Sequence, residues 1–189
     1  MALAVPSTRR LTVGDFDRMA LLPENADKVL EFVGGEIVEM PSNPFASAIS
    51  SRINGFLFLY LRENPIAHLT GEAGGYQVAG ERYAPDVGVI LRARQPELAR
   101  QGYNPNAPDL AVEVDFPSSY ETQEMLRVKV ANYLAAGSVV WIVRPERNMV
   151  EVYAPGQPAR LCGLSDTLTI EQILPGFTLR VGEILPSAE

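Results

Sequence analysis

The chain has 189 residues, of which 47% are hydrophobic and 21% are charged, and its formal net charge at pH 7 is −7. This length and composition suit one globular domain and exclude a largely disordered chain. We expect a single domain over 1–189, with a core of about 11–183 and a loose arm over 1–10. No apolar run reaches the roughly 20 residues that span a bilayer, so we expect no membrane partner.

The counts of reactive residues exclude several classes of site. The single cysteine, Cys162, rules out an internal disulfide and a cysteine-rich zinc site, which fits a cytoplasmic protein. The only histidine, His68, leaves no conventional hydrolase triad unless it serves itself, and we interpret it as an ordinary strand or loop residue. The acidic net charge disfavours DNA binding by phosphate neutralisation alone, although a local basic patch remains compatible with it.

The first third of the chain predicts a short helix, a hairpin and a long helix. Thr12–Met19 has a helical pattern. Residues 28–40 form a hairpin pattern around Gly34-Gly35, and within it Glu31 either faces solvent or, as the less common alternative, points into a site. A long amphipathic helix begins at Asn43-Pro44 and ends at Asn64-Pro65.

Short apolar runs in the rest of the chain predict strands. They are residues 66–70, 76–78, 87–91, 110–114, 139–143, 149–153, 161–163, 167–170 and 179–181. Residues 92–107 read as a surface loop with a short helical turn at 96–100, and its arginines suit either a solvated loop or a rim that contacts phosphates. A helix capped by Ser118 and Glu121 ends at Gly137. The fold class is therefore α/β (α+β), a central mixed sheet flanked by helices, with an N-terminal β-hairpin and a parallel crossover over 110–143.

Acidic residues interrupt two of the apolar strands. Asp86 precedes the strand 87–91, and Glu113 lies inside the strand 110–114. A buried carboxylate is costly unless it is paired or binds a metal. Two such carboxylates with the backbone carbonyl of Val114 could bind Mg²⁺ or Mn²⁺, which take oxygen ligands. Lys129, on the following helix, could snorkel outward or reach back toward these acids, where it would orient water and stabilise a transition state.

These residues carry a resemblance to known nucleases. Pro85-Asp86 followed by Glu113-Val114-Asp115 resembles the PD-(D/E)XK pattern, except that Asp115 stands where that pattern has lysine. Lys129 matches the variant form in which the lysine has migrated to the next helix. Further segments resemble the Uma-type restriction endonuclease family over roughly residues 11–183. They are Leu30–Glu36, Pro108–Val114, Lys129 with Tyr133–Gly137, Trp141 and Pro175–Phe177.

The resemblance implies a restriction endonuclease-like core, a divalent metal and a homodimer that cleaves DNA. Asp86, Glu113 and Lys129 are the main candidate catalytic residues, with Asp115 and Glu31 as weaker candidates. The chain departs from the family pattern at Met125 and Arg144, where the family often has aspartate. The alternative is a non-catalytic module with a nuclease fold, which binds nucleic acid or a protein partner. A hydrolase of small molecules is a third alternative.

Overall fold

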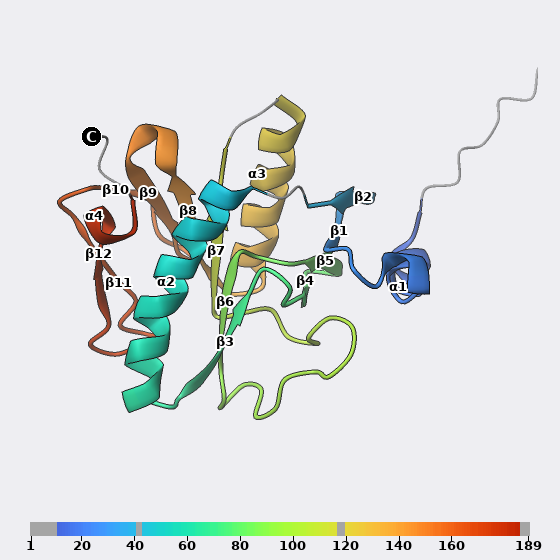
Figure 1. Cartoon of the computed structure of the whole chain (residues 1–189), viewed down its shortest axis with the longest axis horizontal. Coiled ribbons are helices and arrows are strands. Elements are labelled where there is room, and N and C mark those ends of the chain that lie inside the picture. Colours follow the sequence, from blue (N-terminus) through green and yellow to red (C-terminus); the bar gives the residue numbers. More distant parts are fainter. Residues whose placement is uncertain (1–10, 41–42, 117–119, 186–189) are drawn as a thin grey trace, which may run out of the picture.

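A six-stranded mixed sheet runs through the centre of the molecule (Figure 1). The computed structural model describes residues 11–40, 43–116 and 120–185, so that the predicted arm over 1–10 lies outside it. The sheet has the order β10-β9-β8-β7-β6-β3. Its strands are β3 (Ala67–Gly71), β6 (Val87–Leu91), β7 (Leu110–Val114), β8 (Val139–Arg144), β9 (Met149–Tyr153) and β10 (Arg160–Gly163). β7 and β8 are parallel and the other neighbours antiparallel, which confirms the predicted mixed sheet.

The predicted N-terminal hairpin is present, but it belongs to a second, smaller sheet. This small sheet has the order β2-β1-β5-β4. Its strands are β1 (Leu30–Val33), β2 (Glu36–Glu39), β4 (Tyr76–Val78) and β5 (Glu81–Tyr83). The sequence does not predict β5, because Glu81-Arg82-Tyr83 contains two charged residues and is not an apolar run. Its pairing partners are β1 and β4. A two-stranded ribbon of β11 (Thr167–Thr169) and β12 (Thr178–Arg180) completes the strands of the described chain.

Helices pack against the central sheet and against the small sheet. They are α1 (Val13–Ala20), α2 (Pro44–Glu63), α3 (Tyr120–Ala135) and α4 (Val181–Ile184), with single 3₁₀ turns at Pro23–Asn25 and Pro145–Arg147. Thr12 and Asp15 form the capping box of α1, and the Asn43 side chain accepts from the first N–H groups of α2. The predicted cap of α3 lies outside the described residues, whereas Gly137 follows its end with a φ of +90°.

The two long helices, α2 and α3, contact different strands (Figure 1). α2 contacts β3, β6 and β7, and its buried Ile49, Ile53 and Leu57 join a large apolar core with Trp141. α3 contacts β8 and also β1 of the small sheet. The space around α3 is therefore where the two sheets meet.

The loop over 92–107 is irregular, as predicted, but the expected helical turn at 96–100 is absent. Side chains take the place of a helix there: the side-chain oxygen Oδ1 of Asn104 accepts from the Gln95 side chain at 2.7 Å and from the Ala99 N–H at 2.9 Å. One of the loop arginines, Arg94, is engaged by Asp109 at 2.7 Å. In the part of the chain that the structure describes, no helix is long and apolar enough to cross a membrane.

Candidate active site

Lys129 lies buried between two carboxylates from distant parts of the chain. Its Nζ atom donates to both carboxylate oxygens of Glu31, at 2.9 and 3.0 Å, and to Oε2 of Glu113 at 2.8 Å. The three residues are almost inaccessible, with exposures of 5%, 2% and 6% for Lys129, Glu31 and Glu113. Buried charges of this kind are tolerated only when they are paired, so the three side chains form one interdependent unit.

Strand alternation turns both carboxylates toward α3. On β1, Leu30 and Phe32 belong to a small apolar cluster with Phe16 of α1. Because side chains alternate along a strand, Glu31 between them points away from that cluster. On β7, Val112 belongs to the core on the α2 side, and Glu113 after it faces α3. The sequence left open whether Glu31 faces solvent or a site, and the structure places it in the buried cluster.

α3 turns Lys129 inward as part of its buried stripe. Leu126, three residues before it, and Tyr133, four residues after it, lie on the same side of the helix and are buried. Lys129 therefore reaches the strands instead of extending into solvent. Its Nζ atom also lies 5.6 Å from the centre of the Tyr83 ring, a distance at which a cation is attracted to an aromatic face.

Asp86 lies beside the end of β7 because β6 and β7 are antiparallel neighbours. Val87 pairs with Val112, which brings the residue before β6 next to the last residues of β7. The backbone N–H of Val114 donates to Oδ2 of Asp86 at 2.6 Å and fixes its orientation. Burial raises the pKa of Asp86, while the Val114 hydrogen bond and the charge of Lys129 act in the opposite direction.

The cluster contains more acidic side chains than basic ones. The carboxylates of Glu31, Asp86 and Glu113 surround the single ammonium group of Lys129. Burial raises the pKa of Glu113, although the charge of Lys129 opposes this. Burial also acts to lower the pKa of Lys129, but the carboxylates of Glu113 and Glu31 outweigh it and hold that pKa above its ordinary value. A divalent cation would neutralise this excess of buried carboxylate.

The donor atoms of the cluster suit a hard cation. Asp86 and Glu113 offer carboxylate oxygens, and Val114 offers a backbone carbonyl, which are ligands that Mg²⁺ and Mn²⁺ accept. Within the described ranges, no group of three or more His, Cys, Asp or Glu residues is arranged to bind a metal ion. A metal at this place would thus depend on two carboxylates, one carbonyl and water, a set that Mg²⁺ commonly uses because it retains several waters.

Two further residues hold the carboxylates in place. The Tyr133 hydroxyl donates to Oε1 of Glu113 at 3.1 Å, and the Ala84 backbone N–H donates to Oε1 of Glu31 at 2.7 Å. In the sequence, Tyr133 is marked only as part of a segment that resembles the family, although a phenol that is buried on a helix needs a polar partner, which is a signal for this contact. No sequence signal marks Ala84, because any residue other than proline offers the same N–H.

Asp115 lies outside the cluster and belongs to a separate ionic network. Its carboxylate pairs with Arg144 and accepts hydrogen bonds from the Gln123 side chain at 3.1 and 3.2 Å. Arg144 also contacts Glu151 at 3.1 Å, and Glu151 accepts from the Tyr153 hydroxyl. The structure thus brings together Asp86, Glu113, Lys129 and Glu31 and separates the fifth candidate, Asp115, from them.

A groove of about 340 Å³ lies beside the cluster and is lined by one of its members, Asp86. It lies between the N-terminal end of α2, the end of β2 and the segment before β1. Four acidic residues and one lysine line this acidic groove: Asp27, Glu39, Glu72, Asp86 and Lys28. Its excess of carboxylates extends the negative character of the buried cluster toward solvent.

Comparisons with known proteins agree with this architecture. The chain is similar to a crystal structure described as a putative nuclease belonging to DUF820 from Anabaena variabilis, with a TM-score of 0.76 and 21% sequence identity. The alignment covers 92% of this chain and 97% of that chain. No curated protein matches the sequence. The family model Uma2, described as a putative restriction endonuclease, matches residues 13–182. This chain, as its sequence motifs suggested, belongs to the Uma2 family.

Proposed function

We propose that the protein is a divalent-metal-dependent endonuclease of the PD-(D/E)XK type, which hydrolyses phosphodiester bonds in DNA. The observation that supports this most is the buried contact of Lys129 with Glu31 and Glu113, beside Asp86. Carboxylates that bind a metal, next to one fixed cation, are the equipment that phosphodiester hydrolysis requires. Membership of a nuclease family supports nucleic acid as the substrate.

In this proposal Asp86, Glu113 and the carbonyl of Val114 bind Mg²⁺ or Mn²⁺. The bound ion would make a water molecule more acidic and would neutralise charge on the scissile phosphate. The protein prepares its own donor atoms for this purpose. The Val114 N–H keeps Asp86 directed at the site, and the Tyr133 hydroxyl restrains the Glu113 carboxylate.

Lys129 supplies the fixed positive charge that the reacting phosphate meets. Hydrolysis forms a bond between the water oxygen and phosphorus and breaks the bond to a sugar oxygen, which leaves with a proton. The Nζ atom orients the attacking water and stabilises negative charge on the phosphate oxygens. Glu31 holds this ammonium group with two hydrogen bonds and so acts as a positioning residue. Asp115 remains a weaker candidate, because Arg144 already neutralises it.

The proposal also covers the oligomeric state of the protein and its location in the cell. We take the chain to be one domain, as its length suggests, and to lie in the cytoplasm, as its single cysteine suggests. The family resemblance implies that it forms a homodimer. Light scattering on the purified protein tests the dimer directly, since a monomer and a dimer differ twofold in mass. A monomeric mass would remove the dimer from the proposal without affecting the chemistry of the site.

The deciding experiment is a cleavage assay on supercoiled plasmid and single-stranded DNA in Mg²⁺ or Mn²⁺. We expect nicking by the unaltered protein and its loss in Asp86→Asn and Glu113→Gln, which preserve side-chain shape. Glu63→Gln, at an exposed ion pair on α2, is the matched control and should cleave normally. Circular dichroism must show that all variants are folded. Normal cleavage by either site variant would refute the assignment.

A second candidate function is a non-catalytic module with the same fold. Two observations favour it. The carboxylates of Glu31 and Glu113 already neutralise the charge of Lys129. The described residues contain no group of three or more His, Cys, Asp or Glu side chains that could hold a metal ion. Calorimetric titration with Mn²⁺ separates the two functions. Saturable binding that disappears in Glu113→Gln supports the enzyme, whereas absence of both metal binding and cleavage supports the module.

A further inference from the structure

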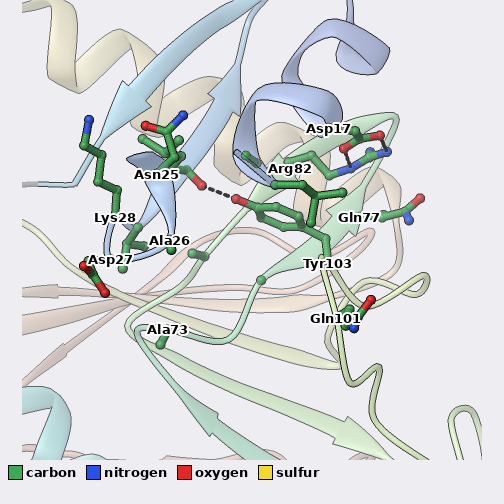
Figure 2. Close-up of a pocket in the computed structure, with 17 residues that line it drawn as sticks. Asp17, Asn25, Ala26, Asp27, Lys28, Ala73, Gln77, Arg82, Gln101 and Tyr103 are labelled. Carbon is green, nitrogen blue, oxygen red and sulfur yellow. Dashed lines mark hydrogen bonds and ion pairs between the residues drawn. The ribbon is translucent and has the colours of Figure 1, made fainter. Parts of the chain in front are cut away.

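A second cavity, shown in Figure 2, shares lining residues with the acidic groove and lies on the side of the small sheet. Its volume is about 570 Å³, within the range of roughly 300–1,000 Å³ that is usual for small-ligand pockets. The residues that line both this cavity and the groove are Asp27, Lys28, Val29 and Ala84. Because the backbone N–H of Ala84 binds Glu31, a ligand in the second cavity would lie next to the proposed catalytic cluster.

Side-chain amides distinguish this second cavity, which we call the amide cavity. Asn25, Gln77 and Gln101 line it, and Figure 2 shows all three around its margin. The Asn25 amide nitrogen donates to the Met19 carbonyl at 2.9 Å, which leaves its oxygen available. Among the described residues, the side chains of Gln77 and Gln101 have no hydrogen-bond partner. The cavity therefore offers donors and acceptors that nothing in the described chain uses.

The charges of the amide cavity are balanced, unlike those of the acidic groove. Its lining contains two acids, Asp17 and Asp27, and two bases, Lys28 and Arg82. Arg82 is only 7% exposed, and its guanidinium binds both carboxylate oxygens of Asp17, at 2.9 and 2.8 Å (Figure 2). Lys28 lies 3.9 Å from Glu39. The formal charges of the lining thus cancel, so the cavity suits an uncharged ligand that forms hydrogen bonds.

One wall of the amide cavity is the fixed ring of Tyr103. Its hydroxyl donates to the Leu30 carbonyl (Figure 2). Its ring centre lies 5.6 Å from that of Phe16. Gly75 lies against the ring so closely that an added Cβ would come within 2.3 Å of it. The ring is therefore held in place before any ligand arrives, which lowers the entropic cost of binding a flat molecule beside it.

We propose that the amide cavity binds one unpaired nucleobase of the nucleic acid strand whose phosphate enters the acidic groove. This inference rests on the proposed function. A nucleobase is planar and uncharged, and Asn and Gln side chains recognise its edge by paired hydrogen bonds. A base can enter such a pocket only when it is extruded from a duplex or belongs to a single strand.

The charge of the protein supports recognition through a base. With a net charge of −7, the chain gains little from the phosphate neutralisation that drives most DNA binding. Base contacts in a neutral cavity do not suffer this penalty, and they place the neighbouring phosphate at the carboxylates. The preferred substrate is thus a strand with at least one unpaired nucleotide next to the scissile bond.

Binding, measured without cleavage, tests the proposal. Fluorescence anisotropy would follow labelled DNA and RNA single strands of about eight nucleotides, with Ca²⁺ in place of Mg²⁺. In each series one nucleotide at a time is made abasic. We expect one position to weaken binding by about tenfold. Ala73→Phe, which fills the cavity from its exposed wall, should weaken binding equally and abolish the effect of that position. The control is Ala131→Phe, an equal change at an exposed site on α3.

The outcomes separate this inference from the proposed function. A base effect that survives in Glu113→Gln, while cleavage is lost, supports both. A base effect in a protein that never cleaves supports the cavity and leaves the enzyme refuted. No effect of any abasic position, normal binding by Ala73→Phe, or no binding of either strand overturns the inference. Equal base effects in DNA and RNA mean that the base alone is read, whereas an effect in one of them identifies its sugar as part of the ligand.

Discussion

The two faces of the central sheet differ in what they bury. On the α2 face, Ile49, Ile53 and Leu57 meet Trp141 in a continuous apolar core. On the α3 face, the apolar residues surround an ionic cluster centred on Lys129. Apolar burial on the first face stabilises the fold whatever the charge state of the protein. The second face is stable only while Lys129 and its carboxylate partners remain paired, so its stability depends on the ionisation of these groups and on any metal bound beside them.

The largest effect should come from removing the cation of the α3 face. Lys129→Met leaves Glu31 and Glu113 buried without their partner, which we expect to lower the free energy of unfolding by about 3–5 kcal/mol. Urea denaturation measures this loss. The double variant Lys129→Met/Glu113→Gln has one fewer unpaired charge and should recover part of it. A loss below about 1 kcal/mol would mean that the cluster is not interdependent.

A comparable deletion on the α2 face should act through packing alone. Leu57 is fully buried, and Leu57→Ala should cost about 2–5 kcal/mol through lost transfer energy and the remaining cavity. Because no charge is involved, the cost should be the same with and without Mg²⁺. Urea denaturation at both metal concentrations checks this. A metal-dependent cost would show that the two faces are coupled.

Metal should stabilise the α3 face selectively. At a Mg²⁺ concentration one hundredfold above its dissociation constant, we expect a gain of about 2.7 kcal/mol in unfolding free energy. Asp86→Asn should remove this gain, whereas Leu57→Ala should retain it. Thermal melts with Mg²⁺ and with EDTA provide the measurement. An equal gain in the Asp86 variant would place the metal elsewhere.

The stability of the metal-free protein should fall as the pH rises from about 4.5 toward 8. Burial raises the pKa of Glu113 from its ordinary value of 4.5 to about 8, so the folded protein retains a proton that the unfolded chain releases. The stabilising proton is fully present below 4.5 and is lost as the pH passes through the raised pKa. One proton changes the free energy by at most about 1.4 kcal/mol per pH unit. The slope difference between unaltered protein and Glu113→Gln isolates this group, and equal slopes would contradict the assignment.

The smallest effect should come from Tyr133→Phe. The change removes one hydrogen bond to Glu113, worth about 0.5–1.5 kcal/mol, and leaves the ring packing intact. We expect a slight loss of stability and a lower kcat, with little change in KM, because the tyrosine positions a carboxylate and does not touch the substrate. Steady-state kinetics provide the measurement. A change confined to KM would instead indicate contact with the substrate.

Local patterns determined most of the elements and the family. The helix α2 begins at Asn43-Pro44 and ends at Asn64-Pro65, as predicted, because helix capping and termination depend on residues that are neighbours in the sequence. The sequence also predicts the glycine turn between β1 and β2 and the apolar strands β7 and β8. Asp86 and Glu113 are likewise recognisable from the sequence alone, because a carboxylate in or beside an apolar strand is costly to bury.

Tertiary structure alone decided how those residues meet. Glu31 and Lys129 are 98 residues apart, and their contact depends on how the small sheet packs against α3. No local sequence pattern predicts that packing. None predicts the three-residue strand β5, which joins β1 to β4 in the small sheet. The pairing of Asp115 with Arg144 was hidden for the same reason, since it needs the parallel alignment of β7 and β8. Sequence determined which groups are charged and which strands are apolar, and long-range packing decided which charges became partners.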